Sequence, residues 1–261
     1  MKIQRITSAR NEKVKRWRKL STRKGREEHG CLLIEGEKLL QEAIRAGWSI
    51  RSILVSEEGT PLLKPFAGSD VPVYSLYAST FAQLVDTQSP QGIAAELAIP
   101  DERDFPAPEG VVLLLDALQD PGNLGSILRT AEAAGVKDLW LGDGTVDPHN
   151  PKVVRSAMGS LFRSRIRRGS LKEAIGELKR RGYQVLATSP RAEKAHFDMV
   201  YPEKTAFLLG NEGNGLSHAV EVLADEQIRI PMPGEVESLN VSVTAGILLF
   251  ERVRQKRAAF R

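Results

Sequence analysis

Polar side chains of the types used in substrate binding and catalysis gather in three segments, each at the end of an apolar run. The segments are DALQDPGNLGSILRT (116–130), LLGNEGNGLS (208–217) and IPMPGEVESLNVSVTAG (230–246). They carry, in this order, Asn123 and Arg129, Glu212, and Ser238 and Asn240. A guanidinium can clamp a phosphate and stabilise a developing oxyanion, while amide, hydroxyl and carboxylate groups can orient a substrate. Together the segments are candidate parts of one active site.

Each of these residues also has a purely structural explanation. Asn123, Ser238 and Asn240 are of the types that cap helix N-termini. Arg129 fits a surface ion pair, and Glu212 fits a solvated carboxylate in a tight glycine turn. The glycines match neither GxGxxG directly after a strand nor the GK[ST] of a phosphate-binding loop, which argues against those nucleotide sites.

The spacing of Asn123 and Arg129 limits how they can act together. Six residues correspond to about 120° around a regular helix, so the two side chains cannot share one face if both are helical. We therefore expect Asn123 to lie before the helix, following the turn that Pro121-Gly122 predicts.

The elements that must position these segments indicate a parallel sheet flanked by helices. Strand-like runs at 111–116, 136–142, 183–189, 205–210 and 227–232 alternate with helix-like runs at 123–135 and 170–182. Such alternation, with strands apolar on both faces, is typical of an α/β fold with a parallel sheet. Ligands bind at the carboxyl ends of strands in these sheets, where the three segments lie.

The chain divides into four predicted parts: a basic leader (1–30), a smaller α/β domain (31–98), a linker (99–110) and the main domain (111–261). The smaller domain has strand-like runs at 31–36, 50–56, 71–77 and 92–98, with helix-like runs at 37–47 and 79–87. The linker, IPDERDFPAPEG, is rich in proline and acidic residues.

The last segment, from Leu239 onward, predicts an amphipathic helix. Leu239, Val243, Ile247, Phe250 and Val253 recur at three- or four-residue spacing. This apolar stripe must pack on something.

Composition narrows the class of protein. No apolar run is long enough to span a membrane, and no apolar stretch follows the basic start as in a signal peptide, so we expect a cytoplasmic protein. Cys31 is the single cysteine, and the four histidines lack metal-ligand spacing. We expect no metal.

Charge is distributed unevenly. Residues 1–30 hold eleven Lys/Arg against three Glu, while the whole chain has a net charge of +4. Basic clusters of this kind are the usual footprint of a nucleic-acid partner, although a solvated, frayed helix also fits. A second basic stretch, 152–181, is open to the same two interpretations: an RNA-binding surface or a solvated helix face.

In combination and in order, the three segments resemble the three motifs of the SpoU (TrmH) family of the SPOUT superfamily. The matching stretches are NLGSILRTAEAAGV, LLGNEGNGLS and IPMPGEVESLNVSVTAGILLFE. The smaller domain resembles, in topology, the ribosomal-protein-like substrate-binding domain of many members. The resemblance implies RNA ribose 2′-O-methylation, S-adenosylmethionine as cofactor, a homodimer, and a deep trefoil knot, which is rare among proteins.

The resemblance also implies site residues. Leu209, Gly210, Ile230, Met232 and Leu239 would surround the cofactor. Arg129 would clamp a phosphate and stabilise the developing alkoxide, because a guanidinium does not give up its proton. Asn123 would orient the nucleotide, and Glu212 would position Arg129 or the ribose. Ser238 and Asn240 would shape the third loop and bind substrate or cofactor.

The expected function has three alternatives, which differ from it in the RNA substrate or in the class of protein. Ribosomal RNA is the expected substrate, because an additional domain offers a second surface for a large folded RNA. Transfer RNA is the rival substrate, and an antibiotic-resistance methyltransferase is a narrower variant of the ribosomal case. A catalytically silent RNA-binding or ribosome-assembly protein is the rival from another class, and it predicts decayed motifs, which the sequence does not show.

Overall fold

The computed structural model describes residues 3–66, 70–211 and 213–258, and the chain forms two compact units. The first unit runs to Asp101 and also takes in His149–Phe162, and the second comprises Glu102–Pro148 and the chain from Arg163 onward. Both units are α/β, and the sheet of the second is parallel, which confirms the predicted fold class.

Within its described residues the first unit has one five-stranded sheet, in the order β1-β4-β3-β5-β2. Its strands are β1 (Ile3–Ile6), β2 (Cys31–Glu35), β3 (Ile50–Ser56), β4 (Val73–Leu76) and β5 (Ile93–Ala98). Its helices are α1 (Glu12–Lys19), α2 (Arg23–His29), α3 (Glu37–Arg45), α4 (Ala78–Ala82) and α6 (Pro151–Ser156), with 3₁₀ turns at Thr60–Phe66 and Ser160–Arg163. The parallel strands β1, β4 and β3 are joined to the antiparallel pair β5 and β2.

The basic leader is part of the first unit and not a separate segment. β1 pairs with β4, and α1 buries Val14 and Trp17 against the sheet. The indole Nε1 of Trp17 donates to Glu96 Oε2 at 2.9 Å, and both side chains are almost fully buried. The frayed-helix interpretation therefore fails, because apolar residues at helical spacing in α1 are covered by the sheet.

Residues 149–162 also pack into the first unit, far from it in sequence. Trp48 Nε1 donates to the carbonyl oxygen of Phe162 at 2.9 Å, and the two rings meet edge to face with centroids 5.1 Å apart. α6 buries Val153 and Val154. Long-range packing of this kind leaves no local signal, so the predicted division, which placed these residues in the main domain, differs from the observed units here.

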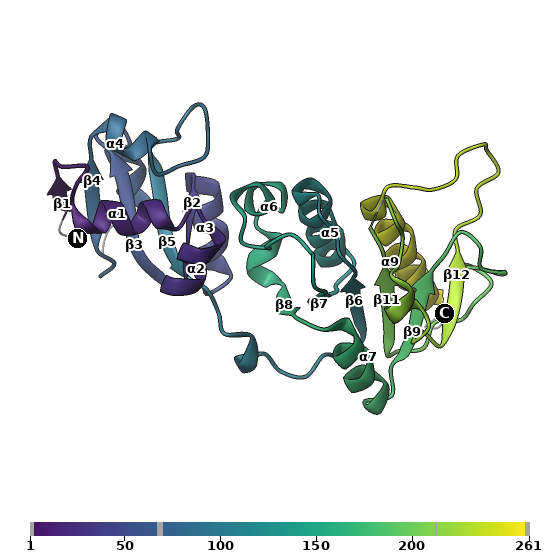
Figure 1. Ribbon diagram of the computed structural model, residues 1–261. Helices are drawn as coiled ribbons and strands as arrows, with labels where there is room; N and C mark the ends of the chain where they lie inside the picture. Colours follow the sequence, from purple (N-terminus) through teal and green to yellow (C-terminus); the bar gives the residue numbers. More distant parts are fainter. Residues whose placement is uncertain (1–2, 67–69, 212, 259–261) are drawn as a thin grey trace. The chain divides into compact units, whose positions relative to one another are not determined.

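The second unit is built on seven parallel strands among its described residues, in the order β10-β12-β9-β11-β6-β7-β8 (Figure 1). The strands are β6 (Val111–Leu115), β7 (Asp138–Leu141), β8 (Arg165–Arg168), β9 (Gln184–Thr188), β10 (Lys194–Ala195), β11 (Thr205–Leu209) and β12 (Glu226–Arg229). The helices are α5 (Pro121–Ala133), α7 (Leu171–Arg180), α8 (His218–Glu221) and α9 (Val241–Ala258), with a 3₁₀ turn at Glu102–Asp104.

Helices cover both faces of the second sheet. α7 and α8 contribute Leu178 and Val220 to a core with Val112 and Leu114 of β6. Because side chains alternate along a strand, Leu113 and Leu115 point to the opposite face. α5 and α9 lie side by side (Figure 1). Strands β6 and β11 are thus buried from both sides, which explains their unbroken apolar sequences.

α9 packs through a different face from the one predicted. Its buried residues are Val241, Ala245, Leu248 and Leu249, whereas Val243 and Phe250 are each about half exposed. Helix α9 carries two apolar faces. The small residues Ala245 and Gly246 allow one of these faces to lie close to α5, where Thr130 faces Gly246. Of the predicted stripe, Leu239, Ile247 and Val253 are partly buried, and Val243 and Phe250 remain exposed.

Candidate active site

The three polar segments emerge at one edge of the second sheet. β6, β11 and β12 run parallel, so the residues after Leu115, Leu209 and Arg229 all lie at the carboxyl ends of strands. β9 separates β12 from β11, and β11 is the neighbour of β6. The parallel register explains why residues distant in sequence share this edge.

Asn123 lies within the first turn of α5, which corrects the prediction that it precedes the helix. The helix begins at Pro121, and the side chain of Asp120 accepts from Asn123 N at 2.8 Å. Proline suits the first helical position because its missing N–H would be unpaired there anyway. The Pro-Gly pair therefore starts the helix here and forms no separate turn.

Asn240 is the residue that joins the first and third segments. Its Nδ2 donates to Asn123 Oδ1 at 2.9 Å. Its Oδ1 accepts from Ser242 N at 2.9 Å, and its carbonyl accepts from Thr244 N at 3.0 Å, as expected of a helix cap. Both interpretations of Asn240 therefore apply, because the same side chain caps α9 and binds Asn123 of α5.

The second segment forms a tight loop after β11. Asn211 and Gly215 exchange backbone hydrogen bonds of 3.1 and 3.0 Å, and Asn211 Oδ1 accepts from Gly213 N and Asn214 N. A Cβ on Gly210 would lie 2.1 Å from the carbonyl carbon of Gly215, so only glycine fits there. Glu212 lies outside the described residues.

Asp116 is a further candidate site residue, which the three motifs did not indicate. Its side chain is 8% exposed, and Oδ2 accepts from Ser217 N at 2.8 Å, which ties the first segment to the second. The next residue, Ala117, has φ of 51°, a conformation that costs a non-glycine residue energy and often occurs near functional sites. A carboxylate directly after a run of buried apolar residues was the signal available in the sequence.

Arg129 and Ser238 are exposed. Among the residues that the structure describes, neither side chain has a hydrogen bond or ion pair. Arg129 lies about 9 Å along α5 from Asn123, at 1.5 Å per residue, and roughly 120° around it. The structure brings Asn123 and Asn240 together, and it leaves the Arg129 guanidinium open to solvent.

The residues expected around the cofactor are apolar and only partly covered. Leu209 is buried at the end of β11, while Gly210, Ile230, Met232 and Leu239 are half-buried. Residues 230–239 make no backbone hydrogen bonds with other described residues. Apolar side chains beside unpaired N–H and C=O groups suit an uncharged aromatic base, which offers flat faces and polar edges.

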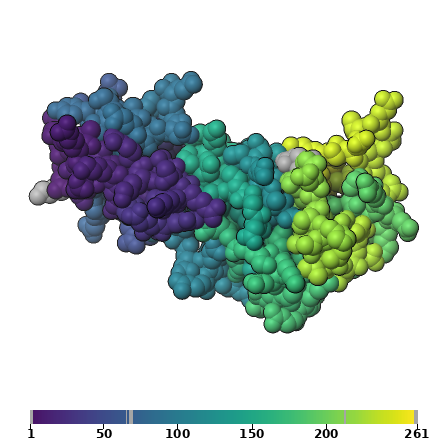
Figure 2. Space-filling model, in the orientation of Figure 1, coloured from purple at the N-terminus to yellow at the C-terminus, as the bar shows by residue number. Residues whose placement is uncertain are grey.

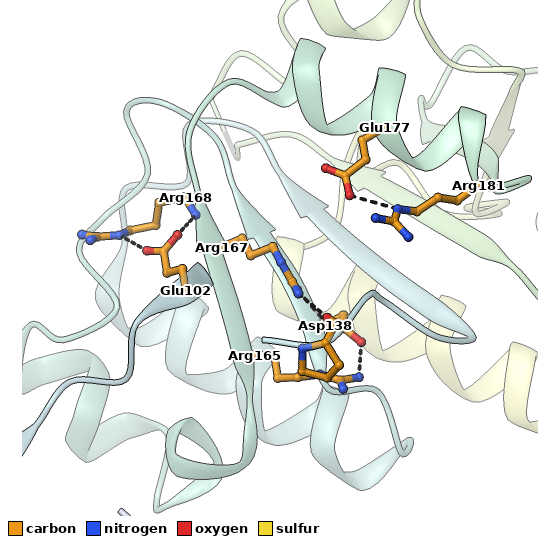
Figure 3. A network of polar contacts seen from close by, with 8 residues as sticks. Glu102, Asp138, Arg165, Arg167, Arg168, Glu177 and Arg181 are labelled. Atoms are coloured by element: carbon orange, nitrogen blue, oxygen red, sulfur yellow. Dashed lines mark hydrogen bonds and ion pairs between the residues drawn. The ribbon is translucent and has the colours of Figure 1, made fainter. Parts of the chain in front are cut away.

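Three arginines of the second basic stretch, Arg165, Arg167 and Arg168, lie on strand β8 and are engaged in ion pairs. Arg165 and Arg167 of β8 both bind Asp138, whose side chain is 2% exposed, and Arg168 binds Glu102 (Figure 3). Burial raises the pKa of nearby Tyr183, and the negative charge of Asp138 adds to this effect. These cations hold the sheet edge and the linker, so this part of the stretch does not provide a free RNA-binding surface.

Other kinds of site are not seen among the residues that the structure describes. No three His, Cys, Asp or Glu side chains in these residues are grouped so that they could hold a metal ion. No helix in the same part of the chain is long and apolar enough to cross a membrane.

Comparison with known proteins identifies the class that this fold and edge define. Residues 110–250 match the model of the SpoU rRNA Methylase family, and residues 11–95 match the MRM3-like substrate binding domain. The chain belongs to the SpoU rRNA methylase family.

Individual relatives extend over nearly the whole chain. It is 39% identical to the 23S rRNA (guanosine(2553)-2′-O)-methyltransferase RlmP of Bacillus subtilis, covering 95% of this chain and 98% of that protein. The SpoU methyltransferase AviRb of Streptomyces viridochromogenes, solved with AdoMet, aligns with a TM-score of 0.88 and 28% identity over 95% of this chain and 99% of that chain.

A structure described as concerning 2-OH methylation of C/U34 on tRNA is similar over a shorter range. It aligns with a TM-score of 0.52 and 33% identity, covering 58% of this chain and 99% of that one. The likeness to AviRb therefore includes both units, whereas more than a third of this chain has no counterpart in the tRNA-related structure.

Proposed function

We propose that this protein transfers a methyl group from S-adenosylmethionine to a ribose 2′-hydroxyl of ribosomal RNA. The observation that carries the proposal is the meeting of three segments at the carboxyl edge of the sheet. There Asn240 holds the third segment to the first, and Asp116 holds the second to the first. Arg129, exposed on α5, adds a cation within the first of these segments.

The cofactor-binding residues are Leu209, Gly210, Ile230, Met232 and Leu239. Leu209 is buried and the other four are half-buried, and residues 230–239 make no backbone hydrogen bonds with other described residues. This combination suits an adenine and a ribose. When bound, S-adenosylmethionine supplies an electrophilic methyl group. The protein's own contribution is to hold the acceptor ribose in attack geometry, which can lower a barrier by roughly 7–11 kcal/mol.

Arg129 binds the phosphate next to the acceptor ribose and stabilises the negative charge that develops on the 2′-oxygen. Its exposed guanidinium is available for a bidentate contact, which lysine cannot make. The hydroxyl proton passes to phosphate or water, because an arginine that remains charged cannot accept it.

The remaining predicted residues act on the nucleotide and on the third loop. Asn123 orients the nucleotide while its Oδ1 receives Asn240, so we assign Asn240 mainly to loop position. Ser238 is exposed on that loop and is proposed to bind substrate or cofactor. Glu212 is proposed to position Arg129 or the ribose.

Ribosomal RNA is favoured over transfer RNA as the substrate. The 23S rRNA enzyme RlmP matches this chain over both units, and a large folded RNA gives the first unit something to bind. This substrate places the proposed activity in the cytoplasm.

We further propose a homodimer and a knotted second unit. The half-exposed Val243 and Phe250 on α9 leave an apolar face that a second copy could cover. The strand order requires residues 230–240 to cross the carboxyl ends of β9 and β11 to reach Asn123, which supports a C-terminus threaded at this edge.

The proposed function is tested by methyl transfer from labelled S-adenosylmethionine to an unmodified 23S rRNA transcript. We expect label in the RNA, on the ribose, and a fall of about 100-fold or more in kcat for Arg129→Ala. Arg129→Lys should recover little of this loss. Near-normal turnover of Arg129→Lys would contradict the bidentate clamp, and absence of transfer with cofactor binding intact would favour a silent RNA-binding protein.

A further inference from the structure

The basic helix α1 is held in one fixed orientation on the first unit. The Trp17–Glu96 hydrogen bond and the buried Val14 fix which face meets the sheet. Lys15, Arg18 and Lys19 are consequently exposed. In Figure 2 the purple N-terminal residues form a broad exposed face of this unit.

The corner after α1 is also fixed. Arg26 is 4% exposed, and its Nη1 donates to the carbonyl oxygens of Leu20 and Ser21 at 2.8 and 3.0 Å. These bonds satisfy carbonyls at the end of α1 and place a buried positive charge there. The cations of α1 therefore have defined positions, unlike those of a frayed tail.

α6 adds cations to the same side of the first unit. Lys152 is exposed and Arg155 is partly exposed. A small cavity is lined jointly by Leu20 and Ser21 from the α1 corner and by Pro151 and Val154 from α6. The residues that follow α1 and those of α6, far apart in the sequence, therefore border the same cavity.

A single turn links the two sets of cations. Arg18 Nη2 donates to Gln83 Oε1 at 2.7 Å, and Arg155 Nη2 binds Asp86 Oδ2 at 3.1 Å. Because Gln83 and Asp86 are only three positions apart, both guanidinium groups reach the end of α4. We call the set Lys15, Arg18, Lys19, Lys152 and Arg155 the basic strip.

Acidic neighbours reduce but do not cancel the charge of the strip. Glu12 binds Lys15 at 2.7 Å, Glu28 binds Lys19 at 3.5 Å, and Asp86 binds Arg155. These pairs are solvent-exposed, so each is weak and easily exchanged for another anion.

We propose that the basic strip binds the phosphate backbone of the substrate RNA. This inference rests on the proposed function and names the surface that recognises the RNA. When cations on a rigid support neutralise RNA phosphates, the RNA releases its condensed counterions, whereas a membrane-binding surface needs exposed apolar side chains among its cations. The exposed neighbours Ser21 and Thr22 on the α1–α2 turn are polar.

The test compares two triple variants of the full-length protein in filter binding to an unmodified 23S rRNA transcript. The strip variant is Lys15→Gln/Lys19→Gln/Lys152→Gln, and the control is Lys172→Gln/Arg180→Gln/Arg181→Gln on α7, which removes the same charge from exposed positions of the second unit. The loss of three phosphate contacts should weaken binding roughly 100-fold at physiological salt and lower the slope of log K against log salt by about 2.7. The control should retain wild-type affinity within about threefold.

Three outcomes would contradict RNA binding by the basic strip. The strip variant could keep the wild-type RNA affinity and salt slope, the α7 control could lose as much RNA affinity as the strip variant, or the strip variant could lose only binding to phosphatidylglycerol vesicles. Calorimetry with S-adenosylmethionine and thermal melting verify that the strip variant is folded. Methyl transfer by the wild type is measured in parallel. If the wild type transfers methyl groups but the strip variant binds RNA normally, only the proposed role of the strip is rejected. If the wild type does not transfer methyl groups, the proposed function is rejected.

Discussion

Asn240 carries two roles that a single substitution can separate. Its Oδ1 caps α9, and its Nδ2 binds Asn123. Aspartate keeps the capping oxygen but has no N–H to donate. The residue therefore offers a clean comparison between helix stability and site geometry.

We predict that Asn240→Ala lowers the free energy of unfolding by about 1 kcal/mol, the usual value of an N-cap, and that Asn240→Asp lowers it less. Both variants should lose at least about tenfold in kcat/KM for methyl transfer, because both release the third segment from Asn123. Urea denaturation and steady-state kinetics measure the two effects. An Asn240→Asp enzyme with full activity would show that the Asn123 contact does not position the loop.

Asp138 is the most enclosed of the acidic partners drawn in Figure 3, and it receives both Arg165 and Arg167. Asp138→Asn should destabilise the protein by about 3 kcal/mol or more, because two partly buried guanidinium groups lose their counter-charge. Glu177→Gln, which breaks the exposed pair with Arg181 in the same view, should cost less than about 1 kcal/mol. Equal effects in chemical denaturation would contradict this ranking.

At the scale of elements, α9 holds the loop that precedes β11. Gln255 accepts from Tyr201 N at 2.9 Å and donates to Met199 O at 2.8 Å, and Glu251 in turn accepts from Gln255 at 2.7 Å. Hydrogen bonding by Arg254 holds the pKa of Glu251 below its ordinary value of 4.5. The ionised carboxylate is thus part of the support for this loop.

Because the pKa of Glu251 is lower in the folded state, protonating this carboxylate destabilises the fold. The stabilisation is fully present above the ordinary pKa of 4.5 and is lost as the pH falls through the lower folded value. We predict that wild-type stability falls more steeply than that of Glu251→Gln below about pH 5. Urea denaturation at several pH values measures the free energy of unfolding, with Glu173→Gln at an exposed position as control. Parallel plots of this free energy against pH for wild type and Glu251→Gln would contradict the prediction.

Local patterns predicted much of the element order. The unbroken apolar runs of β3, β6, β9 and β11 mark buried strands, and the alternation with helices indicates the parallel sheet. β8 could not be found in this way, because its sequence RIRR is stable in a strand only when Asp138 and Glu102 neutralise it. β1 was missed for a related reason, since it is four residues long and pairs with the distant β4.

Part of the candidate site could be predicted from the sequence. Motif order predicts that Asn123, Arg129 and Asn240 share one site, and the structure brings Asn123 and Asn240 into contact. The capping of α5 by Asp120 and the contact of Asp116 with Ser217 depend on the folded structure and could not be predicted. The packing face of α9 was misassigned because both of its faces are apolar, and only the neighbouring helix decides between them.

At the scale of the molecule, the proposed homodimer can be tested at the exposed residues of α9. We predict that Phe250→Glu converts a dimer to a monomer, because a carboxylate at the centre of an apolar contact loses its hydration. Sedimentation equilibrium measures the mass, with Val200→Glu, another exposed apolar position, as a control that should remain dimeric. A monomeric wild type would contradict the proposed assembly.

Mapping ribose methylation tests the central claim most directly. Total RNA from cells with and without this protein is compared at nucleotide resolution, and plasmid-borne wild type and Arg129→Ala are used for complementation. We predict that one 2′-O-methyl group disappears from ribosomal RNA without the protein and returns only with the wild type. An unchanged methylation map, or full restoration by Arg129→Ala, would contradict the account.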